Sequence, residues 1–154
     1  MPDWDELQTY ARQNLKLLLD DSSNMVLGWQ QLKVDGEPTR QAVYVFPMDA
    51  YGEPWLVLVA PVCPEELILS RDALLLSSRL TIGALVIREN DYALRVTLSI
   101  QSLSLPDITL CIERLAWAAV ALREHFMEGK PLVAGQPDKN GATAPPILHG
   151  LWAD

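Results

Sequence analysis

The sequence predicts an α+β fold with two layers: an antiparallel five-stranded sheet and helices on mainly one of its faces, in the order αβββαββα. In residues 92–101 apolar and polar side chains alternate, which is typical of a strand with one buried face. In residues 107–128 the apolar residues recur every three or four positions, which is typical of a helix with one buried stripe. Short connections favour antiparallel neighbours in the sheet.

Length and composition predict one folded domain followed by a tail. The chain has 154 residues, of which 49% are hydrophobic and 21% are charged, as in an ordinary globular domain. Residues 135–146 are rich in Gly, Pro, Asn, Asp, Thr and Ala, a composition that cannot build a core. We therefore expect a domain over residues 1–130 and a flexible tail over residues 131–154.

The first helix is expected over residues 4–19. Asp3 and Glu6 have the spacing of a capping box. An apolar stripe at helical spacing follows, formed by Trp4, Leu7, Ala11, Leu15 and Leu18. Residues 20–24 are Asp, Ser and Asn, which favour a turn, so the helix should end before them.

Three strands are expected next, over residues 25–34, 39–48 and 55–60. In the third, both alternating sets of side chains are apolar, so it should be covered on both faces at least in part. A short helix is predicted from residue 70 or 71 to residue 78. Ser70 would be its cap, and Leu74 and Leu75 would face inward.

The last elements are two strands and the longest helix. The strands are expected over residues 81–88 and 92–102, joined by a tight turn, and the helix over residues 107–128. The stripe of that helix comprises Ile108, Ile112, Leu115, Ala119, Leu122 and Phe126. Gly129 stands where a helix end favours a left-handed residue.

Three stretches, residues 51–62, 80–87 and 92–96, together with the order of elements, resemble the bacterial YbjN family of putative sensory transduction regulators. That family is similar in fold to the class I chaperones of type III secretion. The resemblance covers roughly residues 4–128 and rests on apolar pattern, without a catalytic signature. It implies a non-enzymatic, often dimeric module that binds other proteins, and it brings no active-site residues with it.

No residue pattern indicates catalysis, a cofactor or a metal. The sequence lacks a Gly-rich phosphate loop, a nucleophile elbow and an H-E-x-x-H zinc pattern, so we expect no enzyme activity and no cofactor. His125 is expected to interact with the negative end of its helix, and Cys63 is expected to be an unreactive loop cysteine. The alternative is a small-ligand sensor or enzyme with a pocket between sheet and helices, with Cys63 or His125 near its mouth.

The net charge of -8 repels phosphate backbones, and the basic residues are scattered, so we expect no direct binding of nucleic acid. The same charge favours a basic partner protein, such as one that itself handles nucleic acid. The acidic N-terminus lacks the features of a signal peptide, and the apolar runs are too short for a membrane span. We therefore expect a cytoplasmic protein that binds no membrane.

The long helix carries more apolar surface than one stripe requires. Trp117, Val120 and Ala121 are candidates for a homodimer contact or a partner groove, unless the first helix or the tail covers them. Trp29 and Tyr44 are further candidates on the first two strands. The tail ends in an apolar patch, in which Leu148, Leu151 and Trp152 could form a docking peptide. The predicted function is a homodimeric protein-binding module with a chaperone-like fold.

Overall fold

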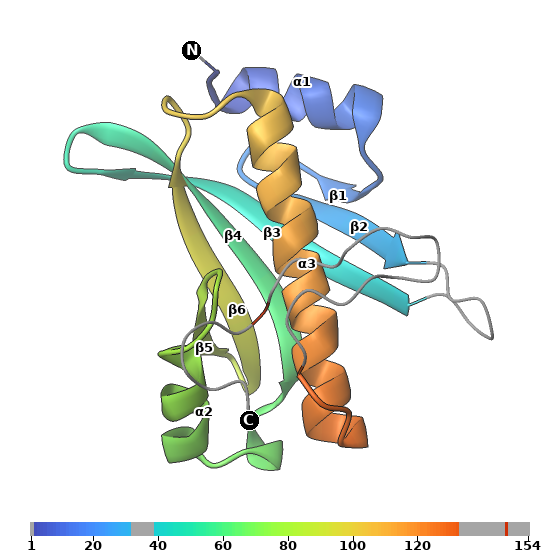
Figure 1. Cartoon of the computed structure of the whole chain (residues 1–154). Coiled ribbons are helices and arrows are strands. Elements are labelled where there is room, and N and C mark those ends of the chain that lie inside the picture. The colour runs from blue at the N-terminus through green and yellow to red at the C-terminus, as the bar shows by residue number, and fades with distance from the viewer. Residues whose placement is uncertain (1, 32–38, 133–146, 148–154) are drawn as a thin grey trace.

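The computed structural model describes residues 2–31, 39–132 and 147 (Figure 1). In chain order its elements are α1 (Trp4–Asn14), β1 (Leu17–Asp20), β2 (Met25–Gln31), β3 (Thr39–Ala50), β4 (Glu53–Pro64), a 3-10 turn (Glu65–Leu67), α2 (Ser70–Ser77), β5 (Ala84–Arg88), β6 (Asp91–Ser99) and α3 (Leu105–Glu128). The α+β class and the antiparallel sheet are as predicted. Within the described residues the sheet has six strands instead of five, in the order β1-β2-β3-β4-β6-β5.

The additional strand is β1, which the sequence placed in the first helix. The helix α1 ends at Asn14, and Leu17–Asp20 pairs with β2 in an antiparallel hairpin. The turn between them is held by Asp21, whose carboxylate accepts hydrogen bonds from the backbone N–H groups of Ser23 and Asn24. A run of leucines suits a helix or a strand equally, and pairing across this turn decides in favour of the strand.

The predicted orientation of the short helix is wrong. Leu74 and Leu75 are 69% and 56% exposed, and Ala73 is the buried residue of α2. Ser70 is the first helical residue and not the cap. The reason lies in the attachment of α2 to the sheet: the Ser77 hydroxyl accepts a hydrogen bond from the Leu85 N–H of β5 at 2.8 Å.

The long helix α3 matches its predicted stripe and its predicted end. Five of the six stripe residues are buried, and Phe126 packs against them partly buried. Ser104 and Asp107 form a reciprocal capping box at the start, and Gly129 ends the helix with φ at 70°. Burial of each large stripe residue stabilises the fold by about 1.5–3 kcal/mol, so packing of α3 across β3, β4 and β6 is a main source of stability.

The two faces of the sheet differ in what covers them. We call the side packed against α3 the helix face; its buried residues include Val43, Val45, Leu56, Leu58 and Leu94. We call the other side the open face. Its apolar cluster consists of Val57, Val59 and Ala93, with Tyr44, Phe46, Met48 and Val86 packed against them. The described residues in this cluster all belong to strands, so the buried valines are shielded by side chains of neighbouring strands.

One residue of the C-terminal segment joins the helix-face core. Ile147 is only 6% exposed and packs in that core, and its carbonyl accepts a hydrogen bond from the Thr81 N–H at 2.9 Å. The segment therefore contacts the domain at this residue. Leu148, Leu151 and Trp152 lie outside the described residues.

Among the described helices, none combines the length and the apolar character needed to cross a membrane.

Candidate functional site

The five predicted interface residues do not form one surface. The rings of Trp29 and Trp117 lie together with centroids 5.5 Å apart, and Ala121 is partly buried against the helix-face core. Val120 is 5% exposed and therefore buried. Tyr44 lies on the opposite side of the sheet. Trp29 pairs with Gln41 of β3, and successive side chains of a strand alternate between the two faces, so Tyr44, three residues after Gln41, points the other way.

The open face carries an apolar cluster whose centre lies on β3 and β4. Tyr44 pairs with Val59 and Phe46 pairs with Val57, so the two aromatic side chains lie directly beside the two valines. Val57 is 0% exposed and Val59 is 3% exposed, although the described part of the chain places no helix over them. The half-buried aromatic rings shield the valines and are themselves accessible.

Arg88 adds a positive charge to this apolar surface. Its guanidinium carbon lies 4.6 Å from the centre of the Tyr44 ring, a cation–π contact. The two residues belong to β5 and β3, which β4 and β6 separate, so the two side chains together span those strands. The open face thus carries a charged group held against its aromatic residues.

Most residues of the open face were not among the predicted site residues. Only Tyr44 was predicted as a site residue. The sequence pattern of the others is that of ordinary strand residues; they are Phe46, Met48, Val57, Val86 and Ala93. A signal was present, since both alternating sets of β4 are apolar and the sequence predicted cover on both faces. The burial of Val57 confirms that both sides of this strand are shielded. What the pattern could not indicate is that side chains of neighbouring strands provide the shielding on one side.

Cys63 is buried, 5% exposed, at the end of β4, and not in the predicted loop. Burial raises the pKa of its thiol, the negative charge of Asp91 raises it further, and the nearby Arg123 partly opposes both. A thiol in this state is protonated near neutral pH and is a poor nucleophile.

The same burial predicts an alkaline loss of stability. Because folding raises the pKa of Cys63, the unfolded chain loses the thiol proton at a lower pH, and unfolding becomes more favourable once the pH exceeds about 8.5. We expect Cys63→Ala to reduce the fall in unfolding free energy between pH 7 and pH 9.5, measured by urea unfolding in reducing buffer. Cys111, whose pKa is also raised by burial, should account for part of the remaining slope. An unchanged slope in Cys63→Ala would contradict this assignment.

His125 has a structural partner. Its Nδ1 lies 2.7 Å from the carbonyl oxygen of Lys130, just beyond the end of α3. His125 lies in the last turn of α3, and the hydrogen bond ties the following residues to that helix.

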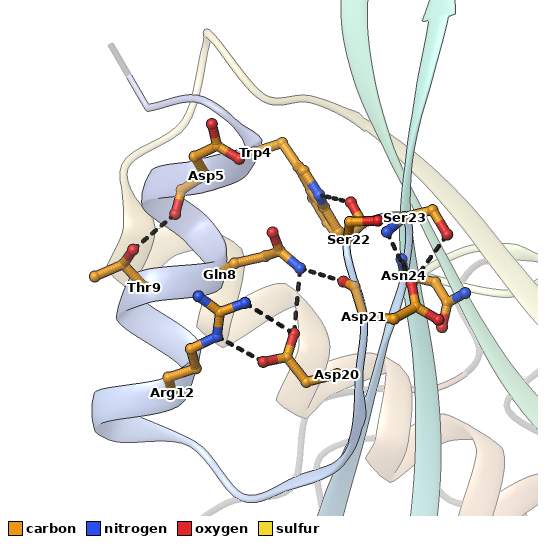
Figure 2. A network of polar contacts seen from close by, with 10 residues as sticks. All are labelled: Trp4, Asp5, Gln8, Thr9, Arg12, Asp20, Asp21, Ser22, Ser23 and Asn24. Carbon is orange, nitrogen blue, oxygen red and sulfur yellow. Dashed lines mark hydrogen bonds and ion pairs between the residues drawn. The ribbon is translucent and has the colours of Figure 1, made fainter.

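A polar network attaches α1 to the β1–β2 hairpin (Figure 2). The Gln8 amide donates hydrogen bonds to the Asp20 carboxylate and to the Asp21 carbonyl, at 3.2 and 2.6 Å. Arg12 forms an ion pair with Asp20 at 2.5 Å, and the Trp4 indole donates to the Ser22 carbonyl at 3.0 Å. These contacts fix the position of α1, and they leave its acidic first turn free for other contacts.

A shallow hollow of about 420 Å³ lies along α1. Its lining residues are Asp3, Asp5, Glu6, Thr9, Tyr10, Gln13 and Leu105. The three carboxylates make it acidic, and neither Cys63 nor His125 belongs to it. The hollow suits a basic side chain better than an anionic ligand.

Among the described residues, no three His, Cys, Asp or Glu side chains gather closely enough to hold a metal ion. No protein-family model matches the chain, and no curated protein matches it.

Proposed function

We propose that the chain is a non-enzymatic protein-binding module of the cytoplasm that recruits a partner protein through its open face. One observation carries this proposal: the open face is apolar over its central strands, and among the described residues no helix covers it. An antiparallel sheet with one solvated face normally presents polar residues there. Apolar surface that remains accessible is typical of interaction sites.

The proposal includes a homodimer and a place among YbjN-like proteins. The Trp29–Trp117 pair and Ala121 supply the dimer contact in this proposal, because they are partly exposed and lie on the side opposite the open face. Support for the family comes from the α+β class and the antiparallel sheet. At micromolar concentration, light scattering should give about twice the chain mass of 17.2 kDa, and a mass near 17.2 kDa would contradict the dimer.

We further propose that the partner protein is basic overall. The formal charge of -8 attracts such a protein at long range, and the acidic hollow along α1 offers carboxylates for individual lysines or arginines. Binding should then weaken as salt concentration rises, because screening shortens the range of this attraction.

A comparison of two charge insertions tests the open face. Phe46→Lys places a cation in its centre, whereas Leu74→Lys changes an apolar residue of α2 that is 69% exposed. We expect proteins captured from cell lysate by the wild-type chain to be lost with Phe46→Lys and retained with Leu74→Lys, as measured by quantitative mass spectrometry. Thermal unfolding of both variants would establish that they are folded. Equal capture by the two variants, or no capture at low and moderate salt, would overturn the proposal.

A further inference from the structure

The open face is basic, although the chain as a whole is acidic. On strands β2 to β6, the charged residues on the same side of the sheet as Val57 are Arg40, Arg88 and Arg95, together with Glu53 and Asp91. Glu53 is the first residue of β4, and Asp91, the first residue of β6, pairs with Arg88, the last residue of β5. The open face therefore carries a small excess of positive charge, and neither Arg40 nor Arg95 has a carboxylate as its cross-strand partner.

Arg95 lies in the middle of this surface. In the register of the sheet it pairs with Val59 on β4 and with Ala84 on β5, and its side chain is exposed. Neither Arg95 nor Arg40 forms a salt bridge within the described residues. A guanidinium beside buried valines can bind a carboxylate through two parallel hydrogen bonds, and exclusion of water by the surrounding apolar groups strengthens such a pair.

This combination identifies the chemistry of an occupant. Apolar side chains would cover Tyr44, Phe46 and Val57, and acidic side chains on either side of them would reach Arg40 and Arg95. A second copy of the chain fits less well, because the open face has three arginines and two carboxylates, so a two-fold contact brings together two faces of the same net charge. A nucleic acid fits less well too, because the net charge of -8 opposes a polyanion.

We infer that the open face binds a protein segment in which apolar residues are flanked by Asp or Glu. The inference rests on the proposed function, and it names the chemistry of the segment that the open face selects. A partner that is basic overall can contain such a segment, because the net charge of -8 acts at long range and the three arginines act at contact.

Selection from a displayed library of random 12-residue peptides tests this inference on the full chain. The peptides selected by the wild-type protein should be enriched in apolar residues with neighbouring Asp or Glu. Arg95→Glu should weaken their binding by at least about tenfold, since contact charge pairs at interfaces contribute about 1.5 kcal/mol or more. Arg114→Glu makes the same charge change on an exposed residue of α3, on the other side of the sheet, and should leave the affinity unchanged.

Each alternative outcome is distinct. Selected peptides that are neutral or basic, or that bind Arg95→Glu as tightly as the wild type, would overturn the inference and leave the proposed function standing. If the wild type binds a labelled single-stranded oligonucleotide and Arg95→Glu does not, the open face binds nucleic acid. That result would overturn the inference. If the wild type is a dimer and Arg95→Glu is a monomer at the same concentration, the open face is a contact between two copies of the chain. That result would also overturn the inference. Recovery of no peptide, together with no capture from lysate, would overturn both the inference and the proposed function.

Discussion

Replacing Ile147 with alanine is expected to lower the free energy of unfolding by about 2–5 kcal/mol, the range measured when a buried isoleucine is truncated to alanine. Ile147 is 6% exposed and packs in the helix-face core, although it lies 19 residues beyond the last residue of α3, Glu128. Urea unfolding of the full chain would measure the loss. The same result would show that residues after 130 complete the core, and that a chain ending at residue 130 is a poor test of the tail as a docking peptide.

Leu74→Ala is the matched control, because Leu74 is 69% exposed and its truncation should cost less than about 0.5 kcal/mol. The Thr81 N–H bond to the Ile147 carbonyl is a backbone contact and survives in the alanine variant. Deletion of residues 131–154 removes that bond as well, so it should destabilise the chain more than Ile147→Ala does. Equal stability of wild type, Ile147→Ala and the deletion would contradict a structural role for Ile147.

Replacing Gln41 with leucine should destabilise the protein by about 2–4 kcal/mol, because it leaves several polar groups without partners. Gln41 is 4% exposed on the helix face. Its amide nitrogen donates to the Ala42 and Pro61 carbonyls at 3.0 and 2.8 Å, and its amide oxygen accepts a hydrogen bond from Arg123 of α3. Burial already lowers the pKa of Arg123, so the guanidinium depends on the partners that it retains.

A double-mutant cycle separates the two contributions. Arg123→Met removes the charge, and in Gln41→Leu/Arg123→Met no partly buried guanidinium is left without its acceptor. The double variant should therefore be more stable than the sum of the single losses predicts, by about 0.5–2 kcal/mol. Gln30→Leu, which makes the same replacement at an exposed position of β2, should be nearly neutral. Strict additivity of the two core variants would contradict the coupling between Gln41 and Arg123.

The features predicted most accurately from sequence are those decided by local pattern. The change from period two to period 3.6 located β6 and α3, because burial of one face imposes a different spacing on a strand and on a helix. Gly129 marked the end of α3 because a left-handed residue is required there. For β1 the local signal is ambiguous: Leu17–Asp20 fits either element, and only its pairing with β2 decides.

The open face was harder to predict, because it depends on register. Tyr44, Phe46 and Val57 become one surface only when β3 and β4 are aligned, and the sequence does not state that alignment. The same holds for Arg40 and Arg95, which are distant in sequence and share a face through β4. Net charge therefore predicted an acidic surface in general and could not indicate the local excess of arginine.

The placement of β4 in the sheet has a consequence for how the chain is made. This strand lies between β3, which precedes it, and β6, which is synthesised much later, and α3 is completed last. Ribosomes add about 5–20 residues per second, so several seconds pass between the synthesis of β4 and that of α3. During this time Leu56 and Leu58 are not yet covered by the helix. A nascent chain paused between β4 and α3 exposes an apolar strand edge and an apolar sheet face together. A chain in that state is prone to aggregate, so slow codons in that interval should lower the yield of native protein.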